Sequence, residues 1–140
     1  MVCSNLMAIT VGTIASLVTL SAAPAMSEKL SYEWQTDRDY YNRISDKACT
    51  GNREAYQDLV ASAVGADLPV AMNDLYWMHA EKTCKNDDFV RDMDFAVGLQ
   101  KKSAEAGYPL ALTGYAHRLM MGDKVRQHTG MAVNYFDRAI

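Results

Sequence analysis

The strongest constraint on how this chain can fold is an internal repeat. When Leu68–Ala71 is aligned with Tyr108–Ala111, the proline and alanine of the two segments fall in register, 40 residues apart. Each proline opens a stretch with the apolar spacing of a helix, and each stretch is followed by a polar turn and a second helical stretch. Helix-turn-helix units that recur at about this period are typical of α-solenoids, in which each unit buries its open face against the next.

The second copy, residues 107–140, shows the pattern most clearly. Pro109 suits the first turn of a helix, and Gly107 suits the left-handed end of the helix before it. The apolar stripe of the helix predicted from Pro109 to Met121 consists of Leu112, Tyr115, Ala116 and Leu119. Gly122 then opens a turn. A second stripe, which predicts the partner helix, consists of Met131, Ala132, Tyr135, Phe136 and Ala139.

The first copy, residues 67–106, predicts helices from Pro69 to about Lys82 and from Phe89 to Ala106. Small residues are expected in both copies where helices approach closely, namely Ala71, Ala96, Ala111, Ala132 and Ala139. The last apolar stripe is still running at Ile140. We therefore expect either a frayed last helix or a second repeat that is truncated because this is the front part of a longer protein.

The segment of residues 26–66 is expected to cover the open face of the first repeat. Glu33–Asp37 is interpreted as an exposed lead-in, and helices are predicted for Asp39–Ala48 and Arg53–Val64. The covering side chains would be Leu59, Val60 and Ala63. The predicted fold is therefore all-α, an α-solenoid of helix-turn-helix repeats behind an N-terminal helical cap.

Residues 1–25 resemble a secretory signal peptide. They carry no charged side chain, are apolar from Leu6 to Leu20, and end with Ala23 and Ala25 in the small-residue pattern that signal peptidase cleaves. The alternative is an uncleaved membrane anchor, because the apolar run is borderline in length for a span and lacks a basic residue before it. Either reading predicts a chain exported across the inner membrane, into the periplasm.

Two cysteines remain after Cys3 is assigned to the signal. Export to an oxidising compartment favours a disulfide between Cys49 and Cys84, which would fix the cap to the turn of the first repeat. The alternatives are two buried thiols or a metal site, and the second is disfavoured because no His or Cys lies at ligand spacing from either residue.

These features together resemble the Sel1-like repeat family. The matching residues are Ala104-Glu105-Ala106 at the end of the first copy and, in the second copy, Gly107, Ala111, Gly122, Val125, Ala132, Tyr135, Phe136 and Ala139. In the second copy Tyr115-Ala116 replaces a Leu-Gly pair of the family pattern and Lys124 replaces a turn glycine. The first copy matches more loosely, with Asp67 in place of the leading glycine and about four extra residues around Lys85 to Arg91. The match covers about half of the chain.

The two cysteines and the openings of the repeats further resemble the MotX family of exported flagellar motor proteins. In that family one cysteine precedes the first repeat and another lies in its turn, as Cys49 and Cys84 do here. The resemblance implies a non-enzymatic protein that helps recruit stators to the basal-body ring of a sodium-driven polar motor, with ring and stator proteins as partners. The alternative is a periplasmic regulator that binds a sensor kinase or a secreted protein. An enzyme such as a cell-wall hydrolase ranks third.

Little in the sequence points to catalysis or to a cofactor. His79 lies on an apolar stripe and is expected to be a core histidine, and neither His117 nor His128 accompanies a nucleophile. The acidic residues between Asn86 and Asp94 lack the spacing of a calcium loop, so they are expected to cap the following helix. With 17 acidic and 14 basic residues and no basic cluster, nucleic acid is an improbable partner. No metal, cofactor or small-molecule substrate is predicted.

Five side chains are candidates for contact with a protein partner. The aromatic ones, Trp34, Tyr40 and Tyr41, could either anchor an interface or pack at the edge of a small core. Met120 and Met121 border the second turn, where they could fill the core or form an adaptable contact surface.

Overall fold

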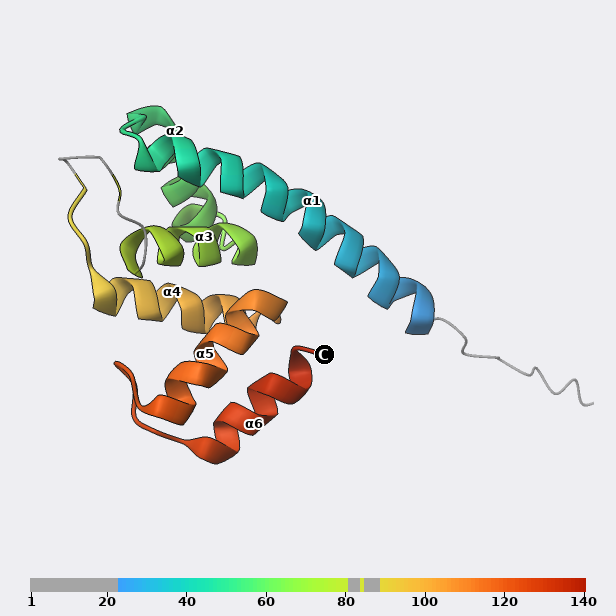
Figure 1. Ribbon diagram of the computed structural model, residues 1–140. Coiled ribbons are helices and arrows are strands. Elements are labelled where there is room, and N and C mark those ends of the chain that lie inside the picture. The colour runs from blue at the N-terminus through green and yellow to red at the C-terminus, as the bar shows by residue number, and fades with distance from the viewer. Residues whose placement is uncertain (1–22, 81–83, 85–88) are drawn as a thin grey trace, which may run out of the picture.

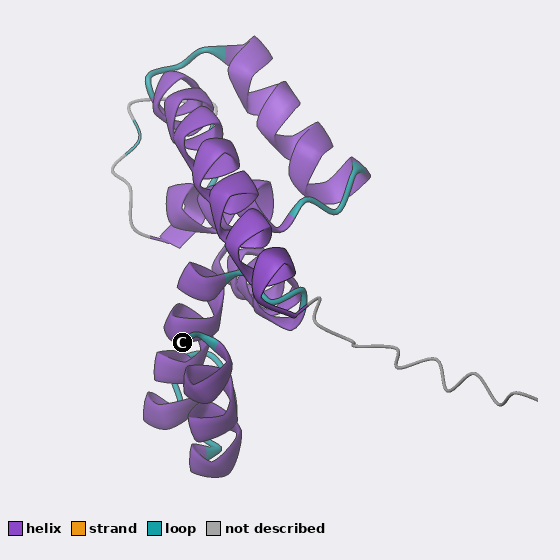
Figure 2. Cartoon of the chain, turned by 90° about the vertical axis from the view of Figure 1, so that its right-hand side faces the viewer, coloured by secondary structure: helices purple, strands orange, loops and turns teal. Residues whose placement is uncertain are grey.

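The computed structural model describes residues 23–80, residue 84 and residues 89–140, and this part of the chain is helical without any strand (Figure 2). The elements are α1 (Ala23–Cys49), α2 (Arg53–Val60), a short π-helical segment η1 (Ala61–Gly65), α3 (Pro69–Ala80), α4 (Met93–Glu105), α5 (Pro109–Met121) and α6 (Thr129–Arg138). The predicted all-α class is confirmed.

Each helix packs mainly on its neighbours along the chain. The most extensive pairings are α3 with α4 and α5 with α6, and α4 packs in turn on α5 (Figure 1). The long helix α1 packs on α2 and α3, so that it lies on the opposite side of α3 from α4. Both segments that begin at the repeated prolines are thus helices, and each pairs with the helix that follows it. We call α3–α4 the first hairpin and α5–α6 the second hairpin.

The core is built from the predicted stripes and small residues. Leu75 and Met78 of α3 and Leu112 of α5 are almost completely buried. Leu59 and Ala63 are also fully buried, as expected for a cover over the first repeat. The small residues at the contacts between helices have no exposed surface at four positions, Ala71, Ala96, Ala111 and Ala132, and Ala139 is partly buried. A larger side chain at the first four positions would force the helices apart.

Glycine and proline define the boundary between the two hairpins. Gly107 has a φ of +92°, and the N–H groups of Gly107 and Tyr108 donate to the carbonyls of Ala104 and Ser103. This pair of bonds is the Schellman arrangement, which satisfies the last carbonyls of α4. Pro109 then occupies the first turn of α5, as predicted. The Ser103 hydroxyl donates to the carbonyl of Pro69 at 2.6 Å, which ties the end of α4 to the start of α3.

Within the described residues, two residues other than glycine have positive φ. Asp67 has a φ of 52° and Lys124 a φ of 59°. Both side chains therefore stand on left-handed backbone at the expense of conformational strain. The Gln127 side-chain amide donates to the Met120 carbonyl across the turn that holds Lys124.

Replacing Lys124 by Gly is expected to raise the free energy of unfolding by about 0.5–1 kcal/mol, because relief of the left-handed strain exceeds the added freedom of the unfolded chain. Urea titration of the purified protein measures this change. Arg126→Gly is the matched control, since Arg126 is an exposed residue of the same turn without positive φ, and it should not stabilise the chain. Equal effects of the two substitutions would refute the strain at Lys124.

Two predicted boundaries are wrong. The lead-in Glu33–Asp37 is part of α1, which runs continuously from Ala23 to Cys49. A stripe at spacings of three and four, Trp34, Arg38, Tyr41, Ser45 and Ala48, accounts for the helix from residue 34 onward, although two polar members conceal the stripe in the sequence. The second correction concerns Phe89, which lies in the loop before α4 instead of on the helix. Asp92 caps α4 by accepting a hydrogen bond from the Phe95 N–H at 2.9 Å, so the helix cannot start earlier.

The cap and the first hairpin are joined covalently. The Sγ atoms of Cys49, at the end of α1, and Cys84, between α3 and α4, lie 2.15 Å apart, which is a bonding distance. This distance is compatible with the predicted pairing of the two cysteines. The predicted signal segment lies outside the described residues except for its last residues, Ala23–Ala25, which begin α1. No helix of the described part is long and apolar enough to cross a membrane.

Candidate functional site

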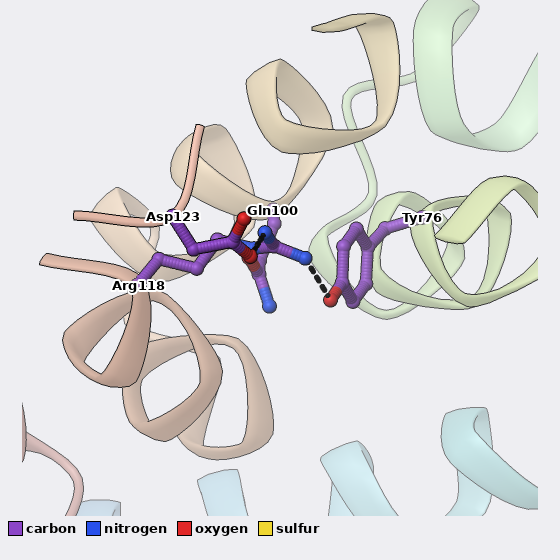
Figure 3. Close-up of polar contacts among 4 residues, drawn as sticks. All are labelled: Tyr76, Gln100, Arg118 and Asp123. Carbon is purple, nitrogen blue, oxygen red and sulfur yellow. Dashed lines mark hydrogen bonds and ion pairs between the residues drawn. The ribbon is translucent and has the colours of Figure 1, made fainter. Parts of the chain in front are cut away.

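A buried arginine joins the two hairpins. Arg118 of α5 is only 9% exposed. Its Nε donates to Gln100 Oε1 of α4 and its Nη2 donates to the hydroxyl of Tyr76 on α3, both at 2.7 Å (Figure 3). Its Nη1 forms an ion pair with Oδ2 of Asp123 in the turn after α5. One side chain of the second hairpin thus bonds to both helices of the first.

The surroundings of Arg118 explain how a charged group can be buried there. Three acceptors from three elements satisfy its fork of N–H groups, and its guanidinium carbon also lies 5.3 Å from the centre of the Tyr76 ring. Gly114 allows Gln100 to reach its position, because a Cβ atom at residue 114 would lie 2.5 Å from Gln100 Nε2. We call Tyr76, Gln100, Arg118 and Asp123 the Arg118 network.

An open groove lies above this network, at the seam between the hairpins. Its cavity volume is about 290 Å³, which is near the lower end of the range for ligand sites. It is lined by the four residues of the Arg118 network together with Trp77, Gly114, His117 and Met121. Trp77 is 36% exposed and Met121 is 75% exposed, so the groove presents an indole ring and a flexible thioether over a polar floor.

The five predicted contact residues fall into two groups. Met120 and Met121 are exposed, as is Tyr40, but only Met121 lines the groove. Tyr41 is a core residue at 8% exposure, and Trp34 is partly buried, with its ring stacked on that of Tyr108 at 5.0 Å. Tyr41 and Trp34 therefore pack within the chain instead of standing free for a partner. They do so because α1 continues across the first hairpin as far as the start of α5.

The Trp34–Tyr108 stack belongs to a small polar cluster between α1, α3 and α5. Tyr108 is buried, and burial, with a smaller contribution from the Asp74 carboxylate, raises its pKa to about 12 although Arg38 acts in the opposite direction. The phenol therefore stays neutral at every physiological pH. This cluster fixes α1 to the body of the protein.

His79 is a core histidine, as expected. It is 4% exposed, its Nδ1 accepts a hydrogen bond from the Asp92 N–H at 3.1 Å, and its ring lies between those of Phe89 and Phe95. Burial lowers the pKa of His79 below its ordinary value of 6.5, against a smaller opposing effect of the Asp92 carboxylate. The neutral imidazole therefore holds the start of α4 against α3.

The stability of the protein is expected to decrease as the pH falls below about 6.5, because His79 binds a proton more readily in the unfolded chain than in the folded one. The contribution of this residue is complete above that pH, and it declines by at most about 1.4 kcal/mol per pH unit until the lower folded-state pKa is reached. Urea titrations between pH 5 and 8 measure the slope, which His79→Phe should reduce. His117→Gln is the matched control, and a slope reduced equally by both would rule out His79 as the cause.

The other histidines and one of the acidic residues that the sequence singled out cap helices or pack against neighbouring rings. His128 caps α6, with its Nδ1 accepting from the Met131 N–H at 3.1 Å, and His117 packs edge-on against Phe136. Asp92 caps α4 as predicted, whereas Asn86–Asp88 lie outside the described residues. Among the residues that the structure describes, no three His, Cys, Asp or Glu side chains gather closely enough to hold a metal ion.

The groove itself was not predicted from the sequence. Trp77, Gln100 and Arg118 come from three different helices and share no local sequence pattern. The available signal was Arg118, a charge that directly precedes the stripe residue Leu119 in an otherwise apolar helix. Comparison of the chain with protein-family models, curated proteins and solved structures finds no match.

Proposed function

We propose that this chain is an exported, non-enzymatic protein that binds another protein through the groove between its two hairpins. The observation that carries the proposal is the combination of exposed Trp77 and Met121 with a fixed floor. Aromatic side chains and methionines are enriched at protein interfaces, and a preformed surface loses less entropy on binding. The Arg118 network supplies that rigidity, because it fixes the relative positions of α3, α4 and α5.

The architecture that we propose is a Sel1-like α-solenoid. Three observations support it. The hairpins begin at equivalent prolines, they pack through buried alanines at family positions, and positive φ occurs at Asp67 and Lys124 where the family pattern has glycine. Repeat proteins of this kind present a continuous surface along one side of the stacked helices and use it for recognition.

For the biological role we propose a component of a sodium-driven polar flagellar motor, on the resemblance to the MotX family. The Cys49–Cys84 pair supports this role and export, because disulfides persist mainly in oxidising compartments such as the periplasm. The groove would then contact a protein of the basal-body ring or the periplasmic part of a stator.

Swimming of a deletion strain tests the role. Cells that lack the gene should keep a normal filament yet fail to swim, and the wild-type gene should restore motility. Unchanged swimming of the deletion strain would exclude the motor role.

Complementation with variants tests the groove. Trp77→Ala should restore motility poorly, whereas Val133→Ala, which changes an exposed apolar residue on α6 outside the groove, should restore it fully. Both proteins must accumulate in the periplasm to the same level. Full restoration by Trp77→Ala would show that binding does not use this groove.

A further inference from the structure

We infer that the groove recognises a cationic side chain, lysine or arginine, carried by a segment of the partner protein. This inference rests on the proposed protein-binding function and specifies the chemistry of the partner. It follows from the distribution of charge among the lining residues.

The guanidinium of Arg118, which is the arginine that lines the groove, already has partners within the chain. Arg118 directs Nε, Nη1 and Nη2 to Gln100, Asp123 and Tyr76, and little of its surface reaches solvent. An anionic group of a partner would reach little of the buried guanidinium and would be repelled by the exposed Asp123 carboxylate beside it. The groove is therefore a poor receptor for a carboxylate or a phosphate.

The accessible charge in the groove is negative. The Asp123 side chain is 60% exposed, and its contact with Arg118 is made through Oδ2. A carboxylate has several acceptor sites, so Oδ1 can accept a further N–H group. Lys124 and Arg126 follow in the sequence but do not line the groove. A cation entering here would meet the exposed Asp123 side chain, whose ion-pair partner Arg118 is itself largely buried.

The apolar lining suits the rest of such a side chain. The indole of Trp77 offers a π face, which attracts an ammonium or a guanidinium group. Met121 can adapt to the methylene stem of lysine or arginine. An aromatic ring, a carboxylate and a thioether around an opening of this size form a receptor for one long basic residue with a short apolar flank.

Selection of a phage-displayed library of random linear peptides on the full chain supplies the probes, and fluorescence polarisation of the synthetic peptides measures their affinity. Peptides whose binding depends on Trp77 should contain lysine or arginine. Replacement of that residue by norleucine should weaken binding about tenfold, the combined effect of a cation–π contact and an ion pair. Asp123→Asn, which keeps an acceptor for Arg118, should weaken binding of the basic peptide and leave the norleucine peptide unaffected.

The outcomes separate the two proposals. Peptides that lose affinity with Trp77→Leu but are unaffected by norleucine and by Asp123→Asn would overturn the preference for a cation and preserve the groove as a binding site. Selection of acidic peptides that bind at the groove would likewise overturn the preference for a cation and preserve the groove as a binding site. Recovery of peptides that are all insensitive to Trp77→Leu would overturn both proposals. Asp137→Asn, an exposed acid on α6 outside the groove, is the matched control and should leave every affinity unchanged.

Discussion

Replacing Cys49 by Ser is expected to lower the free energy of unfolding by about 3–4 kcal/mol, because the bond closes a loop with a sequence separation of 35 residues and thereby restricts the unfolded chain. The loss should be large relative to the total, since a domain of this size is stabilised by only about 5–15 kcal/mol. Urea denaturation of the oxidised protein, followed by circular dichroism at neutral pH, measures it.

The same experiment contains its own control. Cys84→Ser should cost as much as Cys49→Ser, and the double replacement should cost no more than either, because one bond is lost in each case. Wild-type protein treated with a reductant should unfold at the midpoint of the single variants. Clearly additive losses would show that the two cysteines are not bonded to one another.

The second large effect is expected for Arg118→Ala, which should lower the free energy of unfolding by about 3–5 kcal/mol. Two buried hydrogen bonds from a charged donor, each contributing about 1.5–3 kcal/mol, are lost together with the ion pair to Asp123, and the acceptors on Gln100 and Tyr76 remain buried. Arg118→Lys should recover only part of the loss, because an ammonium group lacks the planar fork that reaches several acceptors. Thermal and urea unfolding both measure the change.

Arg126→Ala is the matched control for this prediction. Arg126 is an exposed arginine in the turn after the same helix, and its removal should change stability by less than about 0.5 kcal/mol. If Arg118→Ala were as mild as Arg126→Ala, the Arg118 network would not hold the hairpins together.

The sequence predicted the repeated hairpins well because their signals are local. A proline at the first turn, a glycine beyond the helix end and apolar residues at spacings of three and four act within a few residues of one another. Hence α5 was predicted with its observed limits, and Gly107 with its left-handed backbone. The Cys49–Cys84 pair was also predictable, because only two cysteines remained once the signal segment was set aside.

The features that the sequence did not predict depend on tertiary contacts. The early start of α1 is supported by Trp34, which packs on Tyr108, a residue more than seventy positions away. Phe89 belongs to a helical spacing in the sequence, yet in the structure its ring packs against His79 and Tyr56 from a loop. The groove was missed for the same reason, since its floor combines residues of α3, α4 and α5 that share no local pattern.

A double-mutant cycle measures whether Arg118 joins the two hairpins into one body with a groove at their seam. Tyr76→Phe removes only the hydroxyl on the first hairpin, and Arg118→Met removes only the guanidinium on the second. We predict a coupling free energy of about 1–2 kcal/mol between the two substitutions, as expected for a hydrogen bond to a charged group. Strictly additive losses would contradict the account, because they would mean that the two hairpins do not meet through this arginine.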